Sequence, residues 1–185
     1  MHSAPKSGHS PGGEHPADHG ALRGDYIFCP MCGNRLGERM AAGRLRPACE
    51  SCSFIHFRNP GVGAAVVVRN GGRLLLVRRG PTATQSGKWS IPAGFVDYGE
   101  DIRDGAAREL LEETGLAADI GEPVWVATNF HDPAKVTVGV WFEGTVTGGT
   151  LVAGDDADDA RWFDLHDLPE LAFETDAAYL ATLDD

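Results

Sequence analysis

Three glutamates crowd the end of a predicted helix in the segment RELLEETG, residues 108–115. Glu109, Glu112 and Glu113 stand at i, i+3 and i+4, so their carboxylates share one helix face. Like charges at these spacings destabilise an isolated helix by about 0.2–0.5 kcal/mol per pair, and the helix dipole disfavours anions near the C-terminus. Gathered carboxylates are, however, the oxygen ligands that Mg2+ or Mn2+ prefers. The segment therefore predicts a site for a hard divalent cation.

Residues around this helix fit the same site. Gly94 and Gly99 bracket a loop that can approach a metal or a phosphate closely, because neither has a side chain. Glu100 lies where this loop returns toward the helix, and Arg108 precedes Glu112 by four residues, so its guanidinium can hold that carboxylate in place. A cation held here would bridge phosphate oxygens, neutralise charge in the transition state and help to form a hydroxide nucleophile.

All four cysteines belong to two CxxC pairs that 16 residues separate. Cys29 and Cys32 form the first pair, and Cys49 and Cys52 form the second, a spacing that predicts a tetrahedral Zn2+ site. A redox CxxC would need a strand–helix setting, which the pattern lacks, and disulfides would need an oxidising compartment. Four cysteine ligands leave no position open for catalysis, so this zinc should stabilise a segment too small to fold alone.

The elements that must position the glutamates follow an α/β pattern. NGG at 70–72 is a hairpin signal between two apolar strands, and the helix has an apolar side formed by alanines and leucines. The predicted elements are, in order, strands at 61–70 and 73–79, a loop at 80–94, a helix at 104–114, strands at 123–130, 136–146 and 160–165, and a helix at 175–183.

Composition and charge exclude some classes of function. The chain of 185 residues carries a formal charge of −11, and from Asp97 onward 22 acidic residues face four basic ones. Such a chain is a poor general binder of nucleic-acid backbones. The longest apolar run, 62–68, is too short to span a membrane, and no cationic, apolar signal segment opens the sequence. We therefore expect a cytoplasmic protein.

The stretch GFVDYGEDIRDGAARELLEETGL, residues 94–116, resembles the Nudix box, G-x5-E-x7-R-E-U-x-E-E-x-G-U with U aliphatic. All nine defined positions in these 23 residues are filled. The resemblance implies a Nudix hydrolase, an α/β/α sandwich with a mixed sheet. Residues 1–24 are rich in Gly, Pro, Ser and His and offer little to bury, so we expect a disordered tail there. The cysteine spacing predicts a four-cysteine zinc ribbon at 25–58, and the resemblance implies a Nudix domain at 59–185.

The same resemblance implies the roles of the box residues. Glu109, Glu112 and Glu113 would bind Mg2+ or Mn2+, with Glu100 as a further ligand and the Gly94 carbonyl nearby. The catalytic set would be Arg108, Glu112 and Glu113. The identity of the general base varies within the family, and two choices remain open here. The base is either Glu112 or a distal carboxylate, Asp156 or Asp159, in the acidic segment 154–163.

The family hydrolyses a nucleoside diphosphate linked to another group. Zinc ribbons precede the domain in NADH pyrophosphatases, but the SQPWPFP-like array that those enzymes carry after the box is missing here. The layout is more similar to the zinc-ribbon FAD and ADP-ribose pyrophosphatases of plant plastids, through residues 57–60, 87–100 and 162–175. We therefore expect ADP-ribose as the first substrate and FAD or NADH as the second.

Aromatic and basic residues supply candidate substrate contacts. Trp89, Phe130 and His131 could stack on a base, although Trp89 and Phe130 also suit a core and His131 a plain loop. Neighbours on a strand point to opposite faces, so at most one of Arg78 and Arg79 faces the cleft.

A different class of function remains as the alternative. The fold would then sense a nucleotide, and the ribbon would contact nucleic acid or protein through its arginines at 35, 39, 44, 46 and 58. The intact glutamate set favours catalysis, with a small nucleotide as the partner and no membrane. A homodimer formed through the ribbon is a further option.

Overall fold

A computed structural model describes residues 26–132 and 134–183. The predicted tail at 1–24 lies outside the described residues. The chain divides after Arg58 into two compact units, each of which is described by itself. In the described residues no helix is long and apolar enough to cross a membrane.

The first unit is built around a short antiparallel hairpin. Strand β1 (Gly37–Ala41) pairs with β2 (Arg44–Ala48) through a turn in which Ala42 and Gly43 both have positive φ. Isolated bridges from Phe28 to Arg35 and from Ala48 to Ile55 tie the flanking segments to this hairpin. The hairpin and the two tied segments bring the two CxxC pairs together.

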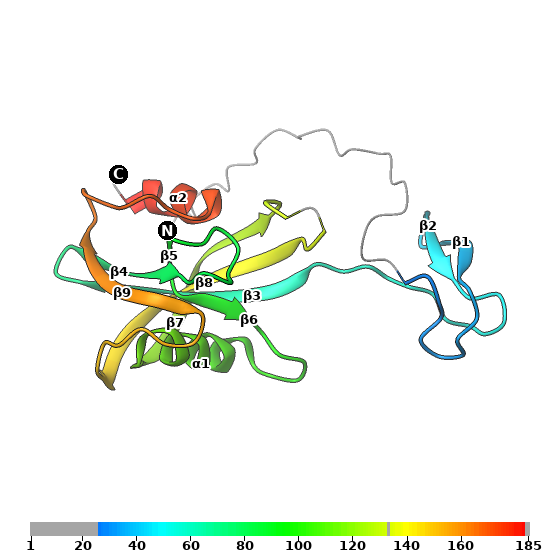
Figure 1. The fold of residues 1–185 in the computed structure, drawn as a ribbon, viewed down its shortest axis with the longest axis horizontal. Helices are drawn as coiled ribbons and strands as arrows, with labels where there is room; N and C mark the ends of the chain where they lie inside the picture. Colours follow the sequence, from blue (N-terminus) through cyan, green and yellow to red (C-terminus); the bar gives the residue numbers. More distant parts are fainter. Residues whose placement is uncertain (1–25, 133, 184–185) are drawn as a thin grey trace, which may run out of the picture. The chain divides into compact units, whose positions relative to one another are not determined.

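A seven-stranded mixed sheet forms the centre of the second unit (Figure 1). The order is β5-β4-β3-β8-β7, with β6 paired to β3 and β9 to β4. Among the strand-to-strand pairs of the described residues only β3–β8 is parallel, and an isolated parallel bridge joins Trp89 to Leu171. The strands are β3 (Gly61–Asn70), β4 (Arg73–Arg79), β5 (Trp89–Ser90), β6 (Ala93–Phe95), β7 (Leu116–Asn129), β8 (Thr137–Gly149) and β9 (Ala157–Asp164).

The helices cover opposite faces of this sheet, α1 (Ile102–Thr114) on one and α2 (Glu174–Leu180) on the other (Figure 1). Strand β3 explains the layering, since Val66 and Val68 pack with Leu110 of α1, whereas Val67 packs with Leu180 of α2. A 3-10 turn, Ala181–Leu183, follows α2. The expected α/β/α sandwich with a mixed sheet is confirmed.

Several element bounds differ from the sequence expectation, among them β8, which runs to Gly149, and β9, which begins at Ala157. The segment 80–94, expected to be a loop, contains β5 and the start of β6. Strand β7 begins at Leu116 instead of residue 123, because register shifts around Pro123 let this edge strand pass Gly121 and the proline. The last helix ends at Leu180 rather than 183, where a 3-10 turn takes over.

Candidate active site and metal sites

Helix α1 is fixed at both ends by its own sequence. The Asp101 carboxylate accepts a hydrogen bond from the Arg103 backbone N–H at 2.9 Å and caps the first turn. Gly115 ends the helix in the left-handed conformation, with φ at 68°, and its N–H donates to the Leu111 carbonyl at 2.8 Å. These two caps hold the carboxylates of the last two turns in place.

Arg108 is the centre of an acidic cage, which we define as Arg108 with Glu100, Glu109 and Glu112. Its guanidinium donates to both oxygens of Glu100, at 2.9 and 3.0 Å, to Glu109 at 2.8 Å and to Glu112 at 3.0 Å. A further bond to the Phe95 carbonyl, at 3.0 Å, ties the cage to β6. The hydrogen bonds from Arg108 lower the pKa of Glu100 to about 2 and keep it ionised.

Glu109 lies against the backbone of the glycine that starts the box. A Cβ on Gly94 would collide with the Glu109 carboxylate, so only glycine permits this close approach. Burial raises the pKa of Glu109, while the hydrogen bond and the charge of Arg108 oppose the rise. The Gly94 backbone and the Glu109 carboxylate therefore form one oxygen-rich corner.

Glu113 stands apart from the acidic cage. Its side chain is buried, 2% exposed, and accepts a hydrogen bond from the Ala93 backbone N–H at 2.9 Å. Burial raises its pKa to about 8, and the neighbouring charges of Asp156 and Glu109 act in the same direction. A divalent cation beside Glu113 would favour the ionised form instead.

The carboxylates do not converge as tightly as the sequence spacing suggests. Among the described residues, the four cysteines form the one group whose ligand atoms all lie within 4.8 Å of one another. Glu100, Glu109 and Glu112 instead meet at the Arg108 guanidinium, which neutralises part of their repulsion. The donor set is nonetheless the hard oxygen set that a magnesium-like cation needs.

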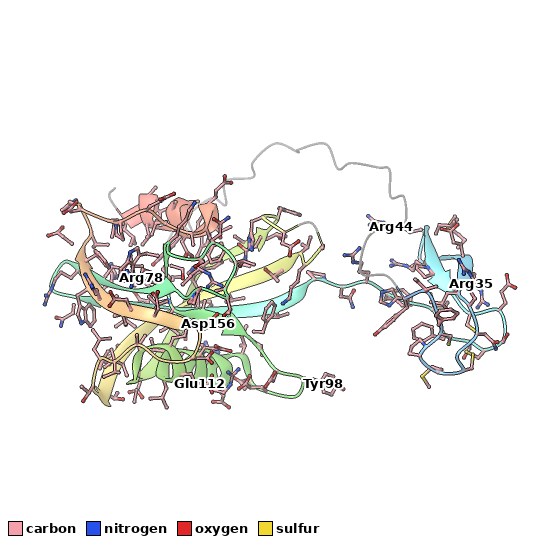
Figure 2. All side chains as sticks on the ribbon, viewed as in Figure 1. Arg35, Arg44, Arg78, Tyr98, Glu112 and Asp156 are labelled. Carbon is pink, nitrogen blue, oxygen red and sulfur yellow. The ribbon has the colours of Figure 1, made fainter. Side chains whose placement is uncertain are left out.

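A cavity of about 360 Å3 opens beside these groups. Gly94 and Ala93, which contact Glu109 and Glu113, both line it, and so does Asp156. Figure 2 shows Glu112 on α1 and Asp156 on the turn before β9. The volume suits part of a small organic ligand.

The two candidate distal carboxylates differ in their surroundings. Asp156 is exposed, lines the cavity and acts electrostatically on Glu113. Asp159 lies on β9, where its carboxylate is 2.6 Å from the Arg161 guanidinium and 3.9 Å from that of Arg78. Only Asp156 of this pair thus faces the cavity.

The candidate stacking residues are also separated. His131 lines the cavity, with its ring 4.8 Å from that of Phe173. Trp89 lies outside the lining and packs edge-on against Phe163 at 4.6 Å, while Phe130 is 65% exposed and also lies outside the lining.

Of the two neighbouring arginines, Arg79 lines the cavity. Its Nε donates to the Thr84 carbonyl at 2.6 Å, and its guanidinium lies 5.0 Å from the Phe173 ring centre. Arg78 is instead paired with Asp158 of β9 at 2.7 Å.

One buried acid in the cavity wall was not singled out in the sequence. Asp176 is 3% exposed and lines the cavity, yet it belongs to α2, far along the chain from the box. One feature of the sequence could have indicated this residue. Asp176 precedes Tyr179 by three residues and Leu180 by four, a spacing that places its carboxylate on the apolar face of the helix.

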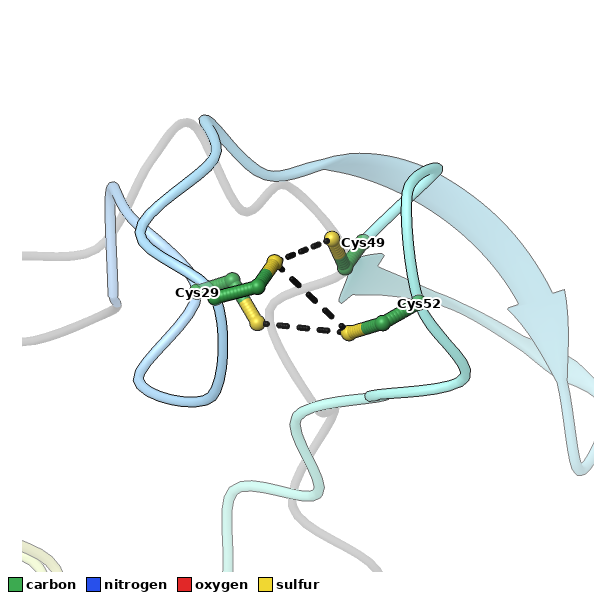
Figure 3. Close-up of side chains that lie close together, drawn as sticks. Cys29, Cys49 and Cys52 are labelled. Atoms are coloured by element: carbon green, nitrogen blue, oxygen red, sulfur yellow. Dashed lines mark hydrogen bonds between the residues drawn. The ribbon is translucent and has the colours of Figure 1, made fainter.

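The four sulfurs of the first unit meet at one point (Figure 3). The Sγ–Sγ distances are 3.6 Å for Cys29–Cys52, 3.5 Å for Cys32–Cys49 and 3.8 Å for Cys32–Cys52, and all four thiols are free. A tetrahedral zinc–thiolate site, with bonds of about 2.3 Å, separates its sulfurs by about 3.8 Å. The sulfur geometry therefore fits a four-cysteine metal site.

Known proteins resemble this chain over most of its length. The NUDIX domain family matches residues 58–183. The ADP-ribose pyrophosphatase of Methanocaldococcus jannaschii is 34% identical over 119 residues, which are 64% of this chain and 70% of that protein. The NAD-capped RNA hydrolase NudC of Stutzerimonas stutzeri is 34% identical over 161 residues, which are 85% of this chain and 55% of that protein. The chain thus spans about half the length of its NudC relatives.

Solved structures agree with this likeness. A NUDIX hydrolase from Nitrosomonas europaea matches with a TM-score of 0.75 and 30% identity, over 84% of this chain and 88% of that one. A MutT NUDIX hydrolase from Burkholderia pseudomallei matches with a TM-score of 0.60 and 28% identity, over 67% and 98% of the two chains.

Proposed function

Because this chain belongs to the Nudix family and is a Nudix hydrolase, we propose that it cleaves the pyrophosphate bond of a nucleoside diphosphate linked to a second group. ADP-ribose is the proposed first substrate, and FAD or NADH comes next. The observation that carries the proposal is the position of the acidic cage, since Gly94, against which Glu109 packs, also lines the cavity.

Residues of the box would hold the divalent cation, Mg2+ or Mn2+. The proposed ligands are the carboxylates of Glu100, Glu109, Glu112 and Glu113, with the Gly94 carbonyl. When bound, the cation would neutralise the negative charge that develops on the transferred phosphate. Arg108 keeps three of these carboxylates oriented through its hydrogen bonds, which reduces the cost of ordering them around a cation.

The general base would accept a proton from the attacking water. Glu112 and Asp156 are the two proposed bases. Glu112 is the most exposed acid of the cage, with 46% of its side chain exposed, so water can reach its carboxylate. Asp156 faces the cavity, and its surroundings support it over Asp159, which two arginines hold. Proton acceptance by either group requires hydrogen-bond reach to water beside the phosphate.

The substrate preference rests on the relatives and on the cavity. An ADP-ribose pyrophosphatase and NudC proteins are both among the similar proteins, and the NADH-type array after the box is missing from this chain. His131, Phe173 and Arg79 provide aromatic surface and positive charge within one cavity. These features suit a base and a phosphate of one ligand.

The first unit would bind Zn2+ through Cys29, Cys32, Cys49 and Cys52 and would serve stability rather than chemistry. None of these four cysteines forms a disulfide, and cysteines that serve as metal ligands suit a reducing compartment, so we propose the cytoplasm as the location.

A homodimer is our proposal for the oligomeric state, because the first unit exposes many large apolar side chains for its size. Sedimentation velocity on the zinc-loaded protein is expected to give a dimer mass, and a monomer at micromolar concentration would contradict this. The exposed residues are Tyr26, Ile27, Phe28, Met31, Met40, Leu45 and Phe57.

A substrate panel tests the proposed reaction. The protein is incubated with Mg2+ and, separately, with ADP-ribose, FAD, NADH and nucleoside triphosphates, in water enriched in 18O. Mass spectrometry is expected to show AMP, with the highest kcat/KM for ADP-ribose, and the position of the label identifies the attacked phosphate. Chelation of Mg2+ is the control and should abolish turnover. Release of neither AMP nor phosphate from any compound would favour the nucleotide-sensing alternative.

A further inference from the structure

Asp176 is a buried carboxylate that faces the cavity from the side of α2. Its side chain is 3% exposed, and its two oxygens accept hydrogen bonds from the Trp141 indole N–H at 2.9 Å and from the Ile91 backbone N–H at 3.2 Å. Each carboxylate oxygen can accept two hydrogen bonds. Asp176 therefore keeps acceptor capacity, and the cavity is the open space that it borders.

A hydrogen-bond acceptor with a purely structural role would not need a negative charge at this buried position in the cavity wall. A buried ionised carboxylate is costly unless it is paired and hydrogen-bonded. Among the described residues, Asp176 forms no ion pair within 4.0 Å, and the cation that acts on it, Arg79, is held by Thr84 and lies over Phe173. Both Asp176 and Arg79 line the cavity, which suggests that each faces a ligand.

The wall around Asp176 suits a flat heteroaromatic ring. The Phe173 and His131 rings lie 4.8 Å apart at the cavity, and Thr175 beside them donates to the Asn129 side chain at 2.6 Å. Aromatic side chains offer stacking surface to any base, whereas a carboxylate accepts only from a donor edge. The wall thus combines an aromatic surface on which any base can stack with one carboxylate, that of Asp176, which accepts only from a base with a donor at that edge.

We propose that Asp176 accepts a hydrogen bond from the exocyclic amino group of an adenine and thereby selects adenine nucleotides over hypoxanthine nucleotides. This inference deepens the proposed function and rests on it for the kind of nucleotide. Hypoxanthine presents a carbonyl oxygen where adenine has the amino group, so two acceptors would face each other. Burial raises the pKa of Asp176 to about 6, which still leaves the carboxylate mostly ionised above pH 7.

The first experiment uses the unaltered, metal-loaded protein. We compare kcat/KM for ADP-ribose and inosine diphosphate ribose, and separately the binding of AMP and IMP by calorimetry at pH 7.5. Both ratios are expected to favour adenine by about tenfold or more, because a site built to hydrogen-bond a donor rejects the analogue that lacks it. Ratios within about twofold of one would overturn the proposal.

The second experiment changes the acceptor. In Asp176→Asn the amide nitrogen replaces one of the two accepting oxygens, so the hydrogen bond from Trp141 or from Ile91 is lost. The N–H of the amide can donate to the hypoxanthine carbonyl, so the preference for adenine should shrink at least about tenfold or reverse. Glu174→Gln is the matched control, because it removes a charge from the same first turn of α2 but is exposed, and it should keep the original ratio. A folded Asp176→Asn protein with an unchanged ratio of adenine to hypoxanthine kcat/KM would contradict the proposal. If this variant does not fold, the first experiment, on the unaltered protein, is the test of the proposal.

Failure of this inference and failure of the proposed function give different results. Preferential binding of AMP without hydrolysis of ADP-ribose or inosine diphosphate ribose would support Asp176 as the selective group and reject the reaction. Hydrolysis of both compounds at equal kcat/KM would support the reaction and reject the role of Asp176.

Discussion

At the scale of single residues, Arg108 gives the acidic box its order. One guanidinium bonds the carboxylates of Glu100, Glu109 and Glu112, each of which would otherwise repel the others. These acids have different environments, since Glu100 has its pKa lowered by Arg108 while Glu109 has its pKa raised by burial. Chemically identical side chains would thereby be suited to different roles around the proposed cation.

Glu112→Gln tests the catalytic role of the most exposed acid of the cage. The amide keeps an oxygen that can accept from Arg108, so the fold should survive, whereas metal binding and proton acceptance are weakened. We expect kcat to fall by about 100-fold or more in the substrate assay. Glu122→Gln, an exposed acid near Arg103, is the control and should remain active. Activity of the Glu112 variant close to the unaltered level would remove Glu112 from the catalytic set.

Asp176 also makes a prediction about stability and pH. Burial raises its pKa to about 6 from an ordinary value of 3.8, so the folded state holds the proton more tightly than the unfolded state. The stability that this group contributes is fully present below pH 3.8 and is lost as the pH rises through 6. Relative to Asp176→Asn, the free energy of unfolding of the unaltered protein should decrease across this window, on the order of 3 kcal/mol.

Urea unfolding of both proteins between pH 4 and 8 measures this difference, with the Glu174→Gln variant as the reference for an exposed acid of the same helix. A difference between the unaltered protein and Asp176→Asn that stays constant over this range would show that Asp176 does not titrate in the way its burial requires.

At the scale of elements, the end of α1 determines where the box glutamates lie. Gly115 has φ at 68°, and a Cβ there would come within 2.6 Å of the Thr150 carbonyl. Gly115→Ala should destabilise the protein by about 2 kcal/mol and reduce activity, because the left-handed conformation is strained and the last turn must shift. Gly148→Ala is the matched control, since nothing lies within 4 Å of its added Cβ. Thermal unfolding checks the prediction, and equal midpoints for both variants would contradict it.

Sequence patterns predicted the elements that have a strong local signal. Helix α1 was expected at 104–114 and spans Ile102–Thr114, because its apolar face and its closing glycine are both local features. The first half of β7 was missed, since Gly121 and Pro123 usually end strands, and only the pairing with β8 shows that an edge strand bypasses them. The short strands β5 and β6 likewise depend on partners distant in sequence.

The residues of the candidate site are likewise of two kinds: those that a local sequence pattern indicates, and those that only the fold brings together. The box residues lie in one continuous segment, so their spacing alone indicates that they share one chemistry. Asp176 and Arg79 meet the cavity only because α2 and β4 are brought together by the sheet. The alternation of side chains along a strand left open which of Arg78 and Arg79 faces the cavity. In the structure Arg79 lines the cavity, and Arg78 is paired with Asp158 of β9.

At the scale of the whole molecule, we propose that the first unit serves stability and the second unit serves the chemistry. The four cysteines belong to the unit that ends at Arg58, and the acidic cage belongs to the unit that follows. Cys49→Ser should therefore release zinc and abolish the cooperative unfolding of the first unit, because a small metal site of this kind links folding to metal binding. The kcat for ADP-ribose should stay within about threefold of the unaltered value, since no residue of the acidic cage changes.

Elemental analysis of the purified protein, together with calorimetric unfolding and the substrate assay, distinguishes the outcomes. Ser51→Ala is the matched control, because it alters an exposed side chain in the same turn without removing a sulfur, and it should retain one zinc per chain. Full zinc content in Cys49→Ser would refute the four-cysteine site. Loss of zinc accompanied by loss of hydrolysis would instead mean that the metal of the first unit supports the catalytic unit, so that stability and chemistry are coupled across the chain.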